Sequence, residues 1–358
     1  MSGRVLSGLA VIVAASFSTN SMAQDIKKLE QCLLDQLQVA DDSQTIGDIR
    51  KTCKQLLNKP DEEAIARDWA KTFKDSPEAA EAFEPGIISR RFINEWVTEE
   101  NPFVITPHRM NYVLPVLTTS GVNDEAYDEI PEFEDNFENI ESKFQLSVKV
   151  PLNNDSLFID GDRLYFAFTI EAWWQVYSDN ISKPFRETNY RPEMFYLAPL
   201  DWHPLGGNTG FSVGVEHQSN GRSNLLSRSW NRVYADFLFE KGNFAMSFRP
   251  WWRVTEDEKE FPGDPKGDDN PDIDDYMGHF EIAGAYKWAW NDDYLELSLM
   301  KRQNFATNNG ALELGFTFPL WGKLRGYAMF FDGYGESLID YDHRQTRLGL
   351  GIALNDIL

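Results

Sequence analysis

The feature that most constrains the fold of this chain is a two-residue alternation of apolar and polar side chains. In residues 163–175 the even positions are Leu, Phe, Phe, Ile, Ala and Trp, whereas the odd positions are Arg, Tyr, Ala, Thr, Glu, Trp and Gln. Residues 243–253 and 347–354 alternate in the same way, and about ten such segments follow residue 143. Because successive side chains of a β-strand point to opposite faces, each segment predicts a strand with one apolar face.

The polarity of the two faces indicates a membrane barrel rather than a soluble β-sandwich. Each segment has about the length of a tilted membrane strand, roughly 9 to 11 residues. A soluble sandwich also alternates, but its outer face would rarely carry Phe, Trp and Ile while its inner face carried Arg, Glu and Gln. Since free strand edges are not tolerated in lipid, the sequence predicts an all-β fold, a closed antiparallel transmembrane β-barrel. Residues 240–243, 290–293 and 320–323 contain the Gly, Asn and Asp residues typical of its turns.

Composition and charge agree with this prediction. Aromatic residues make up 14% of the chain, yet the mean hydropathy is −0.45. A membrane barrel averages an apolar outer face with a polar interior and carries aromatic girdles, so an ordinary hydropathy is expected of it. The formal net charge of −23 argues against nucleic acid as a partner, because a surface that binds nucleic acid must neutralise phosphates.

The region before the barrel is expected to contain three parts. Residues 1–23 predict a secretory signal peptide, with a basic start, an apolar run and a Ser-Met-Ala cleavage site. Residues 24–100 are polar and favour helices, which predicts a periplasmic helix-rich extension. Residues 101–142 predict a connecting segment, and residues 143–358 the barrel domain. Cys32 and Cys53 lie in the extension, and an even pair in an exported protein favours a disulfide.

A candidate catalytic group lies at the end of one predicted strand. His217 and Ser219 are two residues apart, so in a strand they project from one face, which is also the apolar face of residues 211–215. The next predicted strand, residues 231–240, carries Asn231 on its apolar face as well. Because one loop joins the two strands, they can pair as antiparallel neighbours, with Asn231 across from His217 and Ser219.

These three side chains have the chemistry of a hydrolytic triad. A serine hydroxyl becomes a good nucleophile when a neighbouring base takes its proton, and His217 can act as that base. The side-chain carbonyl of Asn231 can accept the other imidazole N–H and hold the tautomer. Gly221 can bring a backbone N–H close to a reacting carbonyl because it has no side chain, and a bound cation can add electrostatic stabilisation. Polar groups on a lipid-facing wall are unfavourable unless they are used or lie at the interface, which favours a catalytic role.

Two other kinds of protein remain open from the residues alone. A non-catalytic outer-membrane barrel, either a porin or a structural protein, would show the same alternation. A porin lumen usually carries segregated charged rings, whereas the polar positions here are small and mixed. A soluble secreted lipase would be expected to carry its serine in a Gly-x-Ser-x-Gly turn, whereas Ser219 lies in His-Gln-Ser-Asn-Gly.

Several separated motifs give the chain a family resemblance. It resembles the outer membrane phospholipase A family of Gram-negative bacteria from about residue 101 to the C-terminus. The motifs that carry the resemblance are HQSNGRS at 217–223, SRSWNR at 227–232, PFRETNY at 184–190, DDNPD at 268–272 and GYGESLIDY at 333–341.

The resemblance implies a twelve-stranded barrel in the bacterial outer membrane. It also implies a calcium-dependent phospholipase that is active as a homodimer and hydrolyses the sn-1 and sn-2 esters of phospholipids and lysophospholipids. Transferred to this chain, the family's roles make Ser219 the nucleophile, His217 the base, Asn231 the orienting residue and Gly221 the oxyanion-hole donor. The implied Ca²⁺ ligands are the Ser227 hydroxyl, the Arg222 carbonyl and a Ser182 carbonyl from the second subunit. A cation site shared between subunits would make dimerisation the switch for activity.

Overall fold

The computed structural model describes residues 86–99 and 106–356, apart from positions 129, 131, 132, 134, 135, 154, 155, 183, 262, 263, 265, 292 and 323. The chain divides into two compact units, residues 1–61 and 62–358, and every described residue belongs to the second unit. The predicted signal peptide, the predicted disulfide between Cys32 and Cys53, and most of the predicted 24–100 extension lie outside the described residues. None of the described helices has both the length and the apolar composition of a membrane-spanning helix.

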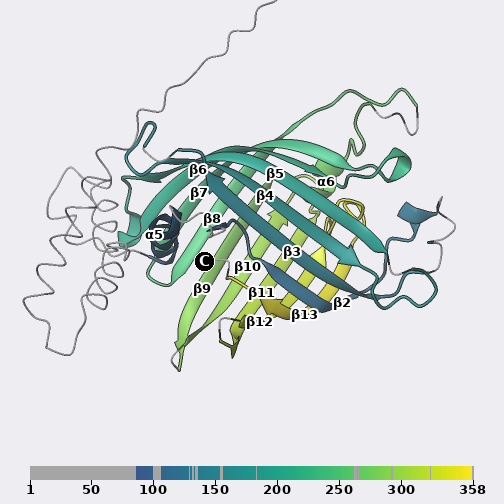
Figure 1. Ribbon diagram of the computed structural model, residues 1–358. Helices are drawn as coiled ribbons and strands as arrows, with labels where there is room; N and C mark the ends of the chain where they lie inside the picture. Colours follow the sequence, from purple (N-terminus) through teal and green to yellow (C-terminus); the bar gives the residue numbers. More distant parts are fainter. Residues whose placement is uncertain are drawn as a thin grey trace, which may run out of the picture. The chain divides into compact units, whose positions relative to one another are not determined.

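Long antiparallel strands form the wall of the second unit (Figure 1). They are β2 (Tyr112–Thr119), β3 (Ile140–Pro151), β4 (Arg163–Trp174), β5 (Phe185–Leu200), β6 (Asn208–Ser219), β7 (Ser229–Lys241), β8 (Phe244–Val254), β9 (Phe280–Trp290), β10 (Asp293–Gln303), β11 (Gly310–Trp321), β12 (Leu324–Gly333) and β13 (Gln345–Ala353). The other elements are the short strand β1 (Thr106–Pro107), the helices α5 (Ile87–Glu99) and α6 (Ile273–Met277), and the 3-10 turns η1 (Glu125–Tyr127), η2 (Pro204–Gly206) and η3 (Asn224–Leu226).

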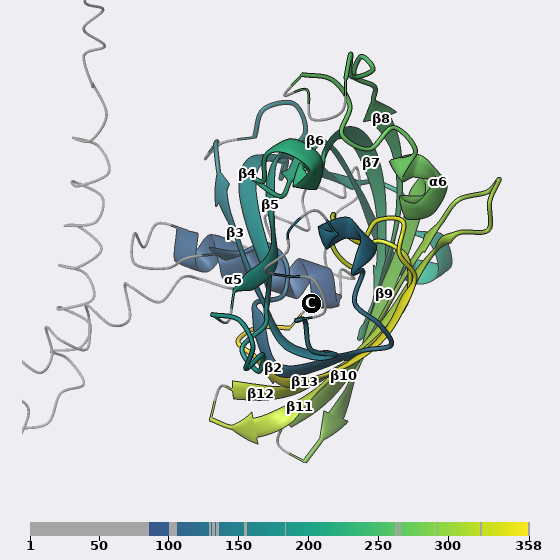
Figure 2. The ribbon, with the colours of Figure 1, turned by 90° about the vertical axis from the view of Figure 1, so that its right-hand side faces the viewer.

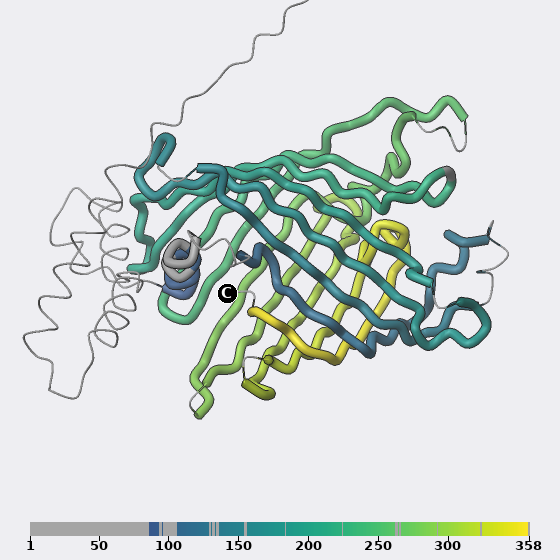
Figure 3. The backbone as a smooth tube through the Cα atoms, in the orientation of Figure 1, coloured from purple at the N-terminus to yellow at the C-terminus, as the bar shows by residue number. Residues whose placement is uncertain are grey.

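The strands from β2 to β13 close into a ring. Each pairs with its neighbours in the sequence, and β13 pairs back onto β2. Strand β1 pairs with β3 beyond the end of β2, so β1 and β2 follow one another along the same edge of β3. Figures 2 and 3 show the closed wall from the side of α6 and as a continuous trace. The predicted closed antiparallel barrel is therefore confirmed, with the twelve long strands that the family resemblance implies.

The two faces of the wall follow the predicted alternation. On β4, Tyr165, Ala167, Thr169 and Trp173 are buried, whereas Phe166 and Trp174 are exposed. Strands β8 and β13 follow the same rule, with exposed side chains at 244, 246, 248, 348 and 350. Apolar side chains on the outside and polar ones inside are what a wall needs when its solvent is lipid.

Strand β2 lies inside the segment for which the sequence predicts only a connection, residues 101–142. The structure corrects that boundary, because residues 112–119 pair with both β3 and β13. The pairing register shifts between Leu114 and Leu117, and Pro115 and Val116 are both exposed. This bulge breaks the two-residue period, so the alternation that marks the other strands is lost here.

The two ends of the barrel differ in their connections. At one end, only two residues separate β7 from β8, β9 from β10 and β11 from β12, and all three connections belong to segments that the sequence predicts as turns. Gly242, Asn291 and Gly322 have positive φ there, as tight hairpin turns require. Longer connections, such as those from β2 to β3 and from β8 to β9, join strands at the other end. The loop 334–344 at that end packs into the barrel, with Leu338 and Ile339 fully buried.

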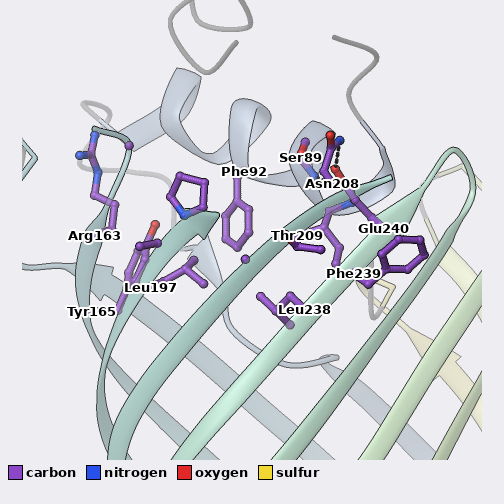
Figure 4. A pocket seen from close by; sticks show the side chains of 15 residues that line it. Ser89, Phe92, Arg163, Tyr165, Leu197, Asn208, Thr209, Leu238, Phe239 and Glu240 are labelled. Atoms are coloured by element: carbon purple, nitrogen blue, oxygen red, sulfur yellow. Dashed lines mark hydrogen bonds between the residues drawn. The ribbon is translucent and has the colours of Figure 1, made fainter. Parts of the chain in front are cut away.

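Helix α5 lies at the short-turn end, opposite α6 (Figure 1). The carboxylate of Glu240, at the end of β7, accepts the backbone N–H groups of Gly86, Ile88 and Ser89 at 3.2, 2.6 and 2.9 Å. Phe92 points toward the wall beside Leu197 and Leu238 (Figure 4). A carboxylate at the start of a helix satisfies N–H groups that have no partner within the helix. Glu240 therefore fixes the first turn of α5 to the barrel.

Candidate active site

The predicted pairing of the candidate triad is present in the structure. Strands β6 and β7 pair with His217 directly opposite Asn231 and with Ser219 opposite Ser229. His217 is exposed, while Gln218 on the other face is 6% exposed. The side chains before His217 on the same face, Val213 and Val215, are 44% and 54% exposed. The candidate group thus lies on the outer surface of the wall, at the long-loop end of an apolar stripe.

Asn231 links two side chains through hydrogen bonds. Its Oδ1 lies 2.8 Å from Nδ1 of His217, and its Nδ2 donates to Oε1 of Glu256 at 2.8 Å. The carbonyl oxygen of Asn231 is therefore the group that faces the imidazole. This pairing leaves Nε2 of His217 available for a second partner. Among the described residues no hydrogen bond joins His217 to Ser219. On the β5 side of β6, Ser219 pairs with Tyr190.

The loop 220–228 is organised by the buried side chain of Asn220. Its Oδ1 accepts the backbone N–H groups of Arg222 and Arg228 at 3.2 and 3.0 Å, and its Nδ2 donates to the carbonyl of Leu226 at 2.7 Å. Gly221 has a φ of +64°, and a Cβ there would lie 3.1 Å from the ring of Tyr190. A residue with a side chain would be strained at this position, so the sharp turn after Ser219 depends on glycine.

The predicted metal ligands lie at the same end of the barrel. Ser227 Oγ donates to Oδ2 of Asp269 at 2.7 Å. The guanidinium of Arg222 donates to the carbonyls of Phe185 and Arg186 at 3.0 and 2.8 Å, which ties the Arg222 side chain to the start of β5. Ser182 is exposed in the loop between β4 and β5. The described residues contain no group of three or more His, Cys, Asp or Glu side chains that could hold a metal ion.

The separated sequence motifs meet around this end. Arg186 donates to Asp340 at 2.9 Å, and Oδ1 of Asn189 accepts the N–H of Leu338 at 2.9 Å, so PFRETNY contacts GYGESLIDY. Oδ1 of Asn270 accepts the N–H of Ser229 at 3.0 Å, which connects DDNPD to SRSWNR. These contacts are inside the barrel or in its loops, close to the strand ends that carry the candidate triad.

Three residues of the site were given no role from the sequence. Asn220 and Asp269 lie in the quoted motifs, and the Asn-Gly pair at 220–221 is a recognisable turn signal in the sequence. Glu256 gives no such signal, because it is one of several acids in an exposed loop between β8 and β9. Its contact with Asn231 depends on the path that this loop takes after β8.

Comparison with known proteins decides the family. The family model described as phospholipase A1 matches residues 88–354. The chain belongs to the phospholipase A1 family. The phospholipase A1 of Klebsiella pneumoniae is 36% identical over 275 residues, which cover 76% of this chain and 90% of that protein. Membership of the family makes this protein a phospholipase of the bacterial outer membrane.

Two solved structures of the family share the fold. Outer membrane phospholipase A from Escherichia coli is 37% identical with a TM-score of 0.65, covering 72% of this chain and 95% of that one, and its structure is also known for an active-site mutant with asparagine changed to alanine. The Salmonella typhi outer membrane phospholipase, a dimer with bound calcium, is 36% identical with a TM-score of 0.66, covering 74% and 97%. The family match begins at residue 88 rather than at about 101, so all of α5 except Ile87 lies within it.

Proposed function

We propose that this phospholipase uses Ser219, His217 and Asn231 as its catalytic triad. In this proposal it hydrolyses sn-1 and sn-2 acyl esters of phospholipids and lysophospholipids, requires Ca²⁺ and is activated by dimerisation. The observation that carries the proposal is the hydrogen bond of 2.8 Å between His217 and Asn231 on the outer wall. A catalytic asparagine also agrees with the E. coli relative, in which a change of asparagine to alanine is an active-site mutation.

The chemistry follows from which atoms are already engaged. Nδ1–H of His217 donates to Asn231, so Nε2 can accept the proton of Ser219 Oγ as that oxygen attacks the ester carbonyl carbon. His217 then gives this proton to the departing alcohol oxygen of the lipid, and an acyl group remains on Ser219. Water, deprotonated by His217, attacks the acyl carbonyl carbon; the bond to Ser219 Oγ then breaks, His217 returns the proton to that oxygen, and the fatty acid leaves. Serine and histidine that are separate in the resting site can come together when the substrate is bound.

The turn at Gly221 supplies a candidate oxyanion donor. Gly221 follows Ser219 by two residues, and its positive φ turns the backbone at the end of β6. A backbone N–H directed at the developing oxyanion stabilises the tetrahedral intermediate more than it stabilises the planar ester. The neutral Asn231 stabilises the imidazolium less than a carboxylate would, so this donor matters more than it does in an aspartate triad.

The residues near the triad fit a calcium ion. Calcium prefers oxygen ligands, and the Ser227 hydroxyl and Arg222 carbonyl are such groups on the loop that follows Ser219. The Asp269 carboxylate, which accepts from Ser227 Oγ at 2.7 Å and pairs with Lys259, is a further oxygen group there. When bound, Ca²⁺ would supply positive charge near the oxyanion. Ser227 and Arg222 would hold the ion, together with the Ser182 carbonyl of a second copy.

Dimerisation is supported by the position of the triad. His217 and Asn231 lie on the lipid-facing wall, where a single barrel offers an open surface rather than a walled groove. A second barrel packed against this wall would enclose the acyl chain and complete the cation site. The S. typhi relative is a dimer with bound calcium.

The connections support an orientation in the membrane. In outer-membrane barrels, short turns face the periplasm and long loops face outward. The triad is at the long-loop end and α5 at the short-turn end. The proposed active site therefore faces the outer leaflet, and α5 lies on the periplasmic side.

The test is release of fatty acid from mixed phospholipid–detergent micelles by the refolded mature protein. We expect activity with Ca²⁺, and loss of activity with EDTA. Ser219→Ala should lower turnover by about 10³-fold or more, because the covalent step is lost. Ser229→Ala, on the same wall opposite Ser219, is the matched control and should keep full activity. Calcium-independent turnover, or an active Ser219→Ala protein, would contradict the proposal.

A further inference from the structure

The Asn231 amide is the middle of a chain of three side chains. His217 Nδ1 lies on one side of it and the Glu256 carboxylate on the other, each at 2.8 Å. Only the first of these contacts is part of the triad. Glu256 is exposed, comes from a different loop and contacts neither His217 nor Ser219 within the described residues. The second contact therefore needs its own explanation.

An asparagine in a triad has an ambiguity that an aspartate does not have. Its amide has a carbonyl oxygen and an NH₂ group of nearly the same shape, and a rotation of 180° exchanges them. With oxygen toward His217, Nδ1 carries the proton and Nε2 is free to act as a base. With NH₂ toward His217, Nδ1 must accept, so the proton moves to Nε2 and the histidine can no longer take a proton from Ser219. Half of the orientations of an unrestrained amide would be inactive.

We propose that Glu256 is a positioning residue that fixes the Asn231 amide in the active orientation. An ionised carboxylate only accepts hydrogen bonds, so it selects the NH₂ group of Asn231. Selecting NH₂ on the Glu256 side places the carbonyl oxygen on the His217 side. This inference rests on the proposed triad and adds to it the group that decides which tautomer of His217 is populated.

The fold explains why Glu256 reaches Asn231. Val254, the last residue of β8, pairs with Asn231, and it is exposed on the outer face. Glu256 follows by two residues, so an extended chain returns its side chain to the same face. The base-orienting asparagine thus lies between His217 on β6 and Glu256 beyond β8, with both contacts on the outer surface of the wall.

The negative charge of Glu256 also favours catalysis in a second way. A negative carboxylate polarises the amide, which makes the carbonyl oxygen a stronger acceptor for the imidazolium that forms during catalysis. Because the contact is exposed, water and salt screen the charge, and its effect is modest. Orientation is therefore the larger contribution.

The test is kinetic, in micelles with saturating Ca²⁺, on Glu256→Ala and Glu256→Gln. We expect Glu256→Ala to lower kcat by about 5- to 10-fold with little change in KM, the size of one exposed charged hydrogen bond. Glu256→Gln can still accept through its carbonyl oxygen and should recover part of that loss. Glu258→Gln, which removes one exposed acid from the same loop, is the matched control and should behave as the parent protein.

A double-mutant cycle separates positioning from other roles. If Glu256 acts through Asn231, Glu256→Ala should have no further effect on kcat in an Asn231→Ala protein. An equal loss of kcat in both backgrounds, or a loss that appears only in KM, would overturn the inference. So would full activity of Glu256→Ala in a protein whose turnover depends on Asn231. Turnover that depends on neither Ser219 nor Asn231 would instead overturn the proposed triad itself.

Discussion

Two neighbouring rungs of the β6–β7 ladder make opposite use of polar side chains. Glu216 faces Arg232 across the ladder, and the next residues along, His217 and Asn231, face each other as well. Glu216 and Arg232 are 4% and 9% exposed and form an ion pair inside the barrel. His217 is exposed on the outside. A step of one residue therefore separates a buried ion pair from the proposed catalytic pair.

The difference shows what each face of the wall can be used for. Inside the barrel, Glu216 is also 3.2 Å from Arg109 and from Arg191, so one carboxylate is shared by three guanidinium groups. Such a network is satisfied only as a whole, and breaking it leaves buried charges without partners. On the outer face, each polar contact joins only two side chains, and it is either uncharged or screened by water and salt. We expect polar contacts on the inner face to control stability and those on the outer face to control turnover.

The largest expected effect is on stability, from substitution in the inner pair of Glu216 and Arg232. Glu216→Ala should lower the free energy of unfolding by about 3–5 kcal/mol, because three arginines lose a buried partner. The measurement is a urea titration of the barrel in lipid vesicles, followed by tryptophan fluorescence. Glu258→Ala, an exposed acid, is the control and should change little. If Glu216→Ala unfolds with the free energy of the parent protein, water in the lumen replaces the carboxylate. The inner face would then not control stability as we expect.

Substitution in the outer pair of His217 and Asn231 should lower turnover rather than stability. Asn231→Ala should lower kcat by about 10²-fold, which corresponds to about 2.7 kcal/mol, while the free energy of unfolding stays within about 0.5 kcal/mol of the parent. Residual activity is expected because, in the proposed triad, Asn231 only orients the base. The same two assays, fatty-acid release and urea titration, measure both quantities. A large loss of stability without a kinetic change in the folded protein would make Asn231 structural.

Glu240 tests whether the rule holds at the other end of the barrel. It is 3% exposed and holds the first turn of α5. Glu240→Gln keeps one acceptor oxygen but turns an NH₂ group toward N–H donors, so stability should fall by about 1.5–3 kcal/mol. Turnover of the folded protein should not change, because α5 is at the opposite end of the barrel from the proposed triad. A parallel loss of kcat would reveal coupling between the two ends.

The smallest expected effect concerns the two cysteines, which belong to neither face. The sequence predicts a disulfide between Cys32 and Cys53 in the exported protein. Mass analysis of the alkylated mature protein should show no free thiol without reductant and two after reduction. Reduction should leave phospholipase activity unchanged, since both residues precede the family match at 88–354. Two alkylatable thiols without reductant would refute the predicted disulfide.

Much of the barrel wall could be predicted from the sequence, because the information is local. The alternation in residues 163–175 needs only the geometry of one strand, and it predicted the inward and outward sets for β4 apart from Ala172, which is buried. The facing of His217 and Asn231 also followed, since one loop joins their strands and parity fixes the face. Strand β2 was missed because its bulge at Pro115 and Val116 interrupts the period.

Contacts between distant parts of the chain could not be predicted in this way. Glu240 binds the start of α5 across about 150 positions in the sequence, and Arg186 meets Asp340 across a similar separation. Closure of the barrel brings these groups together, and no local pattern specifies which loop end meets which strand end. Glu256 is the clearest case, since its sequence context is that of a solvated acid and only the path of the loop after β8 places it on Asn231.

The division between the two kinds of information has a simple physical cause. Alternation is a property of each strand, so the residue pattern alone was enough to predict the wall and the face that carries the proposed triad. The side chains that hold this triad in register come from separate strands and loops. Those partners become neighbours only in the closed barrel, and so their identity emerged from the three-dimensional arrangement of the chain.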